Sequence, residues 1–410
     1  MKILDLFSGA GGLTEGFRSD NFEIICHVEM DKDACLSLKT REAFYYLKES
    51  NNLSIYTDYL NKLISRDELY ETVPNEIIDK VQNFEINQNN LLDIFSIIDT
   101  KLDNNHLAGI IGGPPCQAYS TIGRARNKKI KETDSRIYLY EYYIEFLKKY
   151  SPDFFVFENV KGLLSFKDQK GELLFPKIIS AFSSVGYELE YKILNSEKFG
   201  VSQKRERLFL VGTKNTINLN SSFFEVIDTM EETPPIIFEL LKDLPNLKSG
   251  SSCDTYSTNS LNDYVRKYIR KYEYMPLTYQ IARPHNKNDL EIYKIVAKAK
   301  KEGKNVHYYD LPKRLQTHKN TKAFVDRFKA IDGTSYSHTV VAHIAKDGHY
   351  YIHPDVKQNR SITVREAARI QSFPDDYYFE SSRTAAFKQI GNAVPPILSR
   401  KIAETLIEIL

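Results

Sequence analysis

The sequence lacks long apolar runs. No stretch of its 410 residues approaches the ~20 apolar residues that a membrane helix needs. The first residues, MKILDLFSGAGG, contain no apolar segment followed by a cleavage site. They are instead typical of a strand that enters a glycine turn. These absences predict a cytoplasmic protein with no membrane partner.

Cysteine is also scarce. The four cysteines are Cys26, Cys35, Cys116 and Cys253, with no C-x-x-C and no metal-ligand spacing among them. In a chain without secretion signals this argues against a disulfide framework. We therefore expect no metal, and we expect Cys26, in the apolar run FEIICHVE, to be a core thiol.

Positive and negative charges nearly balance over the whole chain, but not locally. The net charge is +2, yet residues 261–330 carry 17 lysines and arginines against 7 acidic residues, with eight interleaved tyrosines. Basic residues displace counterions from phosphates, so this composition favours a nucleic-acid partner. For 294–304 alone a solvated lysine-rich helix is the better explanation, whereas the whole window favours nucleic acid.

The first half of the chain alternates strand-like and helix-like segments. We expect strands at 2–7, 22–29, 108–113, 153–160, 187–194 and 205–212, and a helix at 136–150. This alternation predicts an α/β fold with a mostly parallel, Rossmann-like sheet, whose ligands bind at the carboxyl ends of the strands.

The regular alternation divides the chain into three parts. We predict a catalytic and cofactor domain at 1–212 with a helical insertion at 40–90, a smaller irregular domain at 213–360, and a C-terminal segment at 361–410. The apolar spacing of 395–410 predicts a helix that packs back on the first domain.

The stretch DLFSGAGG (5–12) predicts a nucleoside-cofactor site. Glycines Gly9, Gly11 and Gly12 allow close approach of a ligand to the backbone and to a helix N-terminus. Glu29 ends the next strand, where an acidic residue typically binds ribose hydroxyls. The pattern alone leaves a dinucleotide and S-adenosylmethionine open, although Thr14 departs from G-x-G-x-x-G.

Three further stretches place reactive groups at the same sheet edge. GGPPCQAYS (112–120) puts Cys116 in a loop fixed by prolines, where a thiolate is a candidate nucleophile. FENV (157–160) places Glu158 at a strand end, where burial can make it a general acid. QKRERLF (203–209) puts Arg205 and Arg207 on one face of a strand, for phosphate or base contacts.

These motifs, in this order, resemble those of the cytosine carbon-5 DNA methyltransferases. RSITVREAARIQSFPDDY (360–377) and QIGNAVPP (389–396) extend the resemblance to residue 396. It implies that 213–360 is the target-recognition domain, that double-stranded DNA is the substrate, and that S-adenosyl-L-methionine is the cofactor, leaving as S-adenosyl-L-homocysteine. It further implies that the target cytosine is flipped out of the duplex.

The resemblance also implies roles for individual residues. Cys116 would add to carbon 6 of cytosine, Glu158 would hydrogen-bond ring nitrogen 3, Arg207 would hold Glu158 and the base, and Arg205 would support the loop and phosphates. Glu29 would bind the ribose and Asp93 the adenine amine. The implied cofactor contacts in full are Phe7, Gly9, Gly11, Gly12, Leu13, Glu29, Met30, Asp93, Ile94, Gly113, Pro115, Leu139, Asn392, Ala393 and Val394.

The chain departs from the family pattern at a few positions. Ala393 stands where serine is frequent, so a hydroxyl contact is absent, and Ala118–Tyr119 replaces the commoner Gly/Pro–Phe. Four histidines, at 338, 343, 349 and 353, invite a metal interpretation. Their alternation with apolar residues instead favours two recognition-domain strands joined at KDG.

Other functions remain as alternatives. A tRNA methyltransferase of the same family carries a Cys-Phe-Thr motif that this sequence lacks. A nicotinamide oxidoreductase leaves Cys116, Glu158 and the arginines unexplained, and a silent DNA-binding relative does not fit the intact P-C-Q and E-N-V. A bacterial restriction–modification role, with a separate cognate endonuclease, and a monomeric state are the expectations by analogy.

Overall fold

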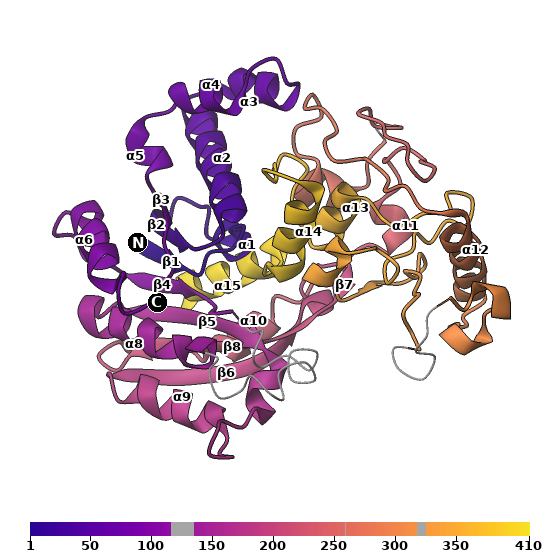
Figure 1. Ribbon diagram of the computed structural model, residues 1–410. Coiled ribbons are helices and arrows are strands. Elements are labelled where there is room, and N and C mark those ends of the chain that lie inside the picture. Colours follow the sequence, from indigo (N-terminus) through magenta and orange to yellow (C-terminus); the bar gives the residue numbers. More distant parts are fainter. Residues whose placement is uncertain (116–134, 259, 318–324) are drawn as a thin grey trace.

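A seven-stranded mixed sheet forms the centre of the molecule (Figure 1). The computed structural model describes residues 1–115, 135–258, 260–317 and 325–410. Within them the strand order is β3-β2-β1-β4-β5-β8-β6, parallel from β3 to β5 and antiparallel at β8 and β6. The strands are β1 (Lys2–Leu6), β2 (Glu23–Glu29), β3 (Val81–Asn83), β4 (Gly109–Gly112), β5 (Phe154–Val160), β6 (Tyr187–Asn195) and β8 (Glu206–Lys214). The predicted α/β fold is confirmed.

Alternate residues of each strand face two separate hydrophobic layers. Leu4 and Leu6 of β1 pack in the layer of α6 (Leu91–Leu102), α8 (Leu139–Tyr150) and α9 (Leu174–Ser183). Ile3 of the same strand packs in the layer of α1 (Gly12–Gly16), α10 (Phe223–Asp228) and α15 (Pro396–Ile409). Since strand side chains alternate between faces, helices cover both sides of the sheet (Figure 1).

The direction of strand addition reverses between β1 and β4. From β1 the chain adds β2 and β3 on one side, and from β4 it adds β5 on the other. The two strands end together, because Leu6 pairs with Gly112. Ligands of open α/β sheets bind at such a switch point, so the fold alone directs attention to the turns that follow Leu6 and Gly112.

The segment between β2 and β3 is largely helical. It contains α2 (Lys32–Glu49), α3 (Leu53–Leu60), α4 (Arg66–Glu71) and α5 (Asn75–Ile78). The helical prediction for 40–90 therefore holds as far as Ile78, but Val81–Asn83 is the edge strand of the main sheet. Aromatic residues of this segment form a cluster that also contains Met275.

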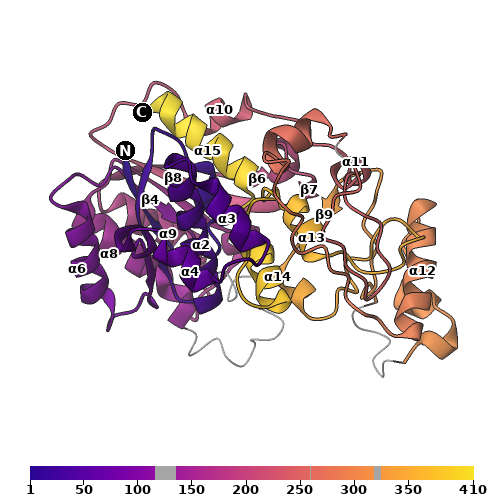
Figure 2. The same cartoon turned by 90° about the horizontal axis from the view of Figure 1, so that it is seen from above.

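The stretch 213–360 has little regular structure. It contains α11 (Ile237–Leu240), a π-turn at Val265–Ile269, α12 (Lys287–Lys301) and the strand β9 (Ser337–His338), which pairs with β7 (Gln203–Lys204). Single 3₁₀ turns occur in the chain at Ser135–Tyr138, Lys161–Ser165, Ser196–Lys198, Tyr308–Asp310, Lys313–Leu315 and Ala342–Ala345. In Figure 2, α12 lies far from the sheet, and it packs on its own small core around Tyr293 and Phe328.

The predicted hairpin of histidine-bearing strands is wrong. His338 belongs to the two-residue strand β9, whose partner is β7 and not the segment around residues 349–353. A 3₁₀ turn follows at Ala342–Ala345, and Ile352 makes only isolated bridges with Ala330 and Ser361. The alternating apolar residues are instead buried singly in two different cores.

The C-terminal segment returns to the sheet through α13 (Val364–Ile370), α14 (Arg383–Asn392) and α15. The Ser399 hydroxyl of α15 donates a hydrogen bond to the Leu13 carbonyl of α1. A side chain at Gly16 would overlap the backbone of Ser399, so α1 and α15 touch without intervening side chains. Of the helices described here, none combines the length and the apolar character that crossing a membrane requires.

Candidate active site

A strained glycine turn follows β1 at the switch point. Phe7 has φ 54°, Gly9 φ 54° and Gly11 φ 68°, all in the left-handed region. For the non-glycine residue Phe7 this conformation is unfavourable and is kept only where the surroundings impose it, typically in functional turns. Nothing lies within 4 Å of the position that a Cβ atom would take at Gly9. The turn thus presents a ring and open backbone at the edge of the sheet.

Glu29 ties this turn to the end of β2. Its Oε2 accepts from the Gly9 backbone N–H at 2.7 Å, and its Oε1 accepts from the Asp31 N–H at 2.8 Å. Burial raises the pKa of Glu29, and these backbone hydrogen bonds oppose the rise. The next residue, Met30, is 57% exposed, which is unusual for a large apolar side chain and leaves it available to a ligand.

The first and last sequence motifs meet beside this turn. A Cβ atom at Gly12 would lie 2.3 Å from the Val394 carbonyl oxygen and 2.9 Å from the Ala393 Cβ. Only glycine permits this approach of the N-terminal turn to the segment after α14. Asn392 is the exposed last residue of α14. The structure therefore brings Gly12, Asn392, Ala393 and Val394 to the same place.

Asp93 and Ile94 belong to α6 and are not among the residues that directly follow β3. Asp93 is exposed in the first turn of α6, and Ile94 is buried in the core below the sheet. The residues that follow β3 directly are Phe84, Glu85 and Ile86, and Asn83 pairs in register with Glu29. The sequence did not predict β3, because its three residues carry almost no strand signal. Leu139 begins α8 and is half-buried.

Glu158 forms an ion pair with Arg207 at the end of β5. The Arg207 Nε lies 3.1 Å from Glu158 Oε1, and both side chains are largely buried. Antiparallel pairing of β5 with β8 sets the distance, since Val160 pairs with Arg207. Burial raises the pKa of Glu158, and the charges of Arg207 and Arg205 offset only part of that rise. A carboxyl group in this state can keep a proton and donate it.

The loop after β4 runs directly past Glu158. A Cβ atom at Gly113 would lie 2.5 Å from the Glu158 carbonyl oxygen and 2.9 Å from Oε2. The Asn159 Nδ2 donates to the Pro114 carbonyl at 3.4 Å, and the Asn159 Oδ1 accepts from the Val160 N–H. Glycine and asparagine thus hold the loop against β5. Pro115 is the last residue described here, and Cys116 lies outside the described residues.

Arg205 and Arg207 do not share a face of one strand, contrary to the prediction. Arg205 stands between β7 and β8 and is completely buried. Its guanidinium donates to the carbonyls of Val340 (2.8 Å) and Gly391 (3.2 Å). The expected support of phosphates does not fit this burial. Arg205 instead joins the stretch 213–360 to the end of α14, while the Arg207 guanidinium forms the ion pair with Glu158.

Buried arginines in α13 and just before it form a second network that the motif pattern did not reveal. Arg369 is fully buried and binds Asp243 and Asp375 through paired hydrogen bonds. Arg360 binds both oxygens of Glu366 at 2.6 and 2.8 Å. These contacts join residues of 213–360 to α13, so the network fixes how the irregular stretch sits on the sheet domain.

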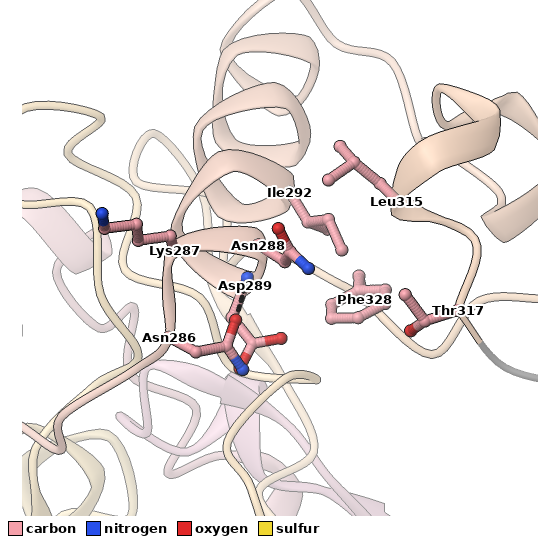
Figure 3. Close-up of a pocket in the computed structure, with 8 residues that line it drawn as sticks. All are labelled: Asn286, Lys287, Asn288, Asp289, Ile292, Leu315, Thr317 and Phe328. Atoms are coloured by element: carbon pink, nitrogen blue, oxygen red, sulfur yellow. Dashed lines mark hydrogen bonds between the residues drawn. The ribbon is translucent and has the colours of Figure 1, made fainter.

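A pocket lies elsewhere, at the amino end of α12 (Figure 3). Its volume is about 250 Å³, and the Phe328 ring and Ile292 form its apolar wall. The Asn286 side chain caps α12 by accepting from the Asp289 N–H at 2.9 Å. The pocket contains none of the residues above and is separate from the candidate site. Within the described ranges, no three His, Cys, Asp or Glu side chains are grouped as metal ligands would be.

Comparison with known proteins agrees with this geometry. The family model for C-5 cytosine-specific DNA methylases matches residues 1–74 and 66–408. The type II methyltransferase M.Bpa9945I of Bacillus paralicheniformis is 39% identical over 100% of this chain and 99% of its own length. The type II methyltransferase M.DdeI of Desulfomicrobium norvegicum is 29% identical over 99% of this chain and 88% of its own.

A solved structure shares the fold. It is a candidate DNA modification methyltransferase encoded within a prophage (E. coli), with a TM-score of 0.64 and 22% identity over 100% of this chain and 99% of that one. The mixed seven-stranded sheet is consistent with this likeness. The family model, matched from residue 1 to residue 408, and the full-length relative in Bacillus place the chain in the C-5 cytosine-specific DNA methylase family.

Proposed function

We propose that this chain is a DNA (cytosine-5-)-methyltransferase that uses S-adenosyl-L-methionine, acts on a flipped-out cytosine in a short duplex sequence, and protects DNA from a cognate restriction endonuclease. The observation that carries the proposal is the Glu158–Arg207 pair against the Gly113–Pro115 loop. It lies at the switch point of the sheet, beside the glycine turn. Membership of the family supports the reaction class.

The residues around the glycine turn suit an S-adenosylmethionine molecule. The open space at Gly9 admits a ligand against the backbone, and the left-handed Phe7 offers a ring to the adenine. Glu29 would receive the ribose hydroxyls, with Met30 and the segment after β3 closing the adenine side. Gly12 and Asn392–Val394 would hold the methionine part. When bound, the cofactor supplies the methyl group and leaves as S-adenosyl-L-homocysteine.

Glu158 would hold the target base. Its Oε1 is engaged by Arg207, and its Oε2 points toward the Gly113 loop. A carboxyl group with a raised pKa can donate its proton to ring nitrogen 3 of cytosine, which draws electrons from carbon 6. Arg207 then keeps Glu158 oriented through both protonation states, because its guanidinium remains charged.

Cys116 would supply the nucleophile. Its thiolate adds to carbon 6, which makes carbon 5 nucleophilic toward a methyl group. Loss of the carbon-5 proton afterwards re-forms the ring double bond and releases the thiolate. The Asn159–Pro114 hydrogen bond supports this role, since it anchors the loop two residues before the thiol.

The stretch 213–360 would read the DNA sequence as a target-recognition domain. Its basic segment 261–330 suits a phosphate backbone. The Arg369–Asp243 and Arg205–Val340 contacts hold it beside the active site, so that a bound duplex presents one base at a time to Glu158. A monomer suffices for this geometry.

A covalent trap tests the proposal. Expression in a host without cytosine methylation, followed by bisulfite sequencing, identifies the target sequence. An oligonucleotide with 5-fluorocytosine at that position then forms an SDS-stable complex in the presence of S-adenosylmethionine, because fluorine cannot leave as a proton does. Cys116→Ser serves as the control and forms none. Failure of the wild-type protein to form the complex contradicts the covalent route.

A further inference from the structure

A buried histidine lies under the glycine turn, between two carboxylates. His27 of β2 is 0% exposed, and its Nδ1 is 3.0 Å from Asp5 Oδ2. Its Nε2 is 3.0 Å from Glu42 Oε1 of α2. Asp5 is 1% and Glu42 2% exposed, so no bulk solvent screens either contact.

The hydrogen bonds of His27 with Asp5 and Glu42 require one proton more than a neutral imidazole carries. A neutral imidazole has one N–H and one lone pair, and an ionised carboxylate can only accept. If Nδ1–H donates to Asp5, the Nε2 lone pair would face the Glu42 oxygen unless a proton lies between them. A buried contact between a nitrogen lone pair and a carboxylate oxygen, with no proton between them, is costly. The geometry therefore requires a proton between Nε2 and Oε1.

The other charges that face His27 are accounted for. Arg18, after α1, pairs with Glu42, and Lys80 lies before β3, with its carbonyl accepting the His27 backbone N–H at 2.7 Å. With the shared proton the cluster of Asp5, Glu42, Arg18 and His27 is neutral. Burial lowers the pKa of His27, and the hydrogen bond that its ring donates to Asp5 opposes this. Whether His27 Nε2 or Glu42 Oε1 carries the proton, the same hydrogen bond bridges the two side chains.

The cluster connects the elements that carry the cofactor turn. Asp5 precedes Phe7 and accepts a hydrogen bond from the Thr14 hydroxyl of α1, on the other side of the turn. His27 lies two residues before Glu29, which binds the Gly9 N–H. The hydrogen-bonded cluster, with its shared proton, thus connects β1, β2, α1 and α2 around the glycine turn.

We propose that His27 is a positioning residue for the cofactor site and acts through a proton shared with Glu42. This proposal rests on the proposed function, since the ligand is S-adenosylmethionine. When the pH rises and the bridge releases its proton to solvent, Nε2 and the Glu42 carboxylate repel each other, and the turn loosens. Affinity for the cofactor then falls as the pH rises.

Calorimetric titration with S-adenosylmethionine from acidic to alkaline pH tests this. His27→Phe removes both ring nitrogens and is expected to weaken cofactor binding about ten-fold at the pH where the wild type binds best, the loss of one charged hydrogen bond. Glu42→Gln carries an amide that donates to a neutral His27 without a titrating proton, but it also removes the carboxylate that pairs with Arg18. Its affinity is therefore expected to start below that of the wild type and to stay constant as the pH rises.

His106→Phe is the matched control. His106 pairs with Asp153 at 2.9 Å on the surface, before β4, and its loss should leave cofactor affinity unchanged. Identical pH profiles for the wild type and Glu42→Gln overturn the inference, even if His27→Phe does not fold. Wild-type affinity in a folded His27→Phe overturns it as well. A wild-type protein that binds no S-adenosylmethionine at any pH refutes the proposed function instead.

Discussion

Replacing Gly113 by alanine perturbs the candidate site with a single methyl group. The added Cβ would lie 2.5 Å from the Glu158 carbonyl oxygen and 2.9 Å from its Oε2. Real Cβ atoms essentially never come closer than 3.0 Å to such neighbours, so the loop and β5 must separate by at least the difference between 2.5 and 3.0 Å. Backbone atoms cannot rotate aside as a side chain does.

The added methyl group should affect both the stability of the fold and the rate of catalysis. Overpacking of this kind costs about 1–3 kcal/mol of unfolding free energy. The displacement acts between Glu158 and the loop that leads to Cys116, and a misplacement of about 1 Å between reacting groups can reduce the rate ~10²-fold. We therefore expect kcat to fall about 10- to 100-fold, with a smaller change in the KM for S-adenosylmethionine.

Steady-state methylation with tritiated S-adenosylmethionine, together with urea unfolding, measures the two effects. Gly109→Ala is the control, because its Cβ would meet the Phe154 ring at 2.3 Å at the opposite end of β4. It should lose stability and keep a kcat close to wild type. A wild-type kcat in Gly113→Ala, or equal losses of kcat in both variants, would refute the reasoning.

Three further substitutions give distinct outcomes. Glu158→Gln should reduce kcat about 10²–10⁴-fold. Burial raises the pKa of Glu158 in the folded state, so the ionised carboxylate opposes folding. In urea unfolding, the variant should therefore gain stability relative to the wild type as the pH rises from acid to neutral. Asn159→Ala removes the donor to the Pro114 carbonyl and should lower the rate of 5-fluorocytosine trapping, with little change in cofactor affinity by calorimetry. Arg369→Met removes the guanidinium that Asp243 and Asp375 share, leaving Asp243 the longer contact to Arg270 at 3.5 Å, and should destabilise the protein by about 3–5 kcal/mol in thermal unfolding.

The strands that carry the site were predictable because their signal is local. The runs that became β1, β2, β4 and β5 are short, apolar and followed by turn residues, so their carboxyl ends could be located without a structure. Gly113 follows β4 directly, and Glu158 lies two residues before the end of β5, both at the edge of the sheet that the sequence indicated. The order of the motifs along the chain identified the family.

What could not be predicted depends on contacts between distant parts of the chain. Arg205 and Arg207 alternate as strand neighbours do, but Arg205 leaves the strand because carbonyls of Val340 and Gly391 bind it. The Arg369–Asp243 pair spans 126 residues and has no local signature. The hairpin predicted from the histidine pattern is wrong for the same reason, since β9 pairs with the distant strand β7.

The bridge at His27 was also invisible in the sequence. Asp5, His27 and Glu42 belong to three different elements, and only the parallel pairing of β1 with β2 and the packing of α2 bring them together. The strand β3 was missed for a similar reason, because it is recognisable only by its pairing with β2.

The most direct test of the account is nucleoside analysis of DNA after incubation with the purified protein and S-adenosyl-L-methionine. Mass spectrometry of the digested DNA distinguishes 5-methylcytosine from N4-methylcytosine and N6-methyladenine. The account predicts 5-methylcytosine, confined to one short sequence, and none with Cys116→Ser. Methylation of any other base, or of tRNA alone, would contradict it.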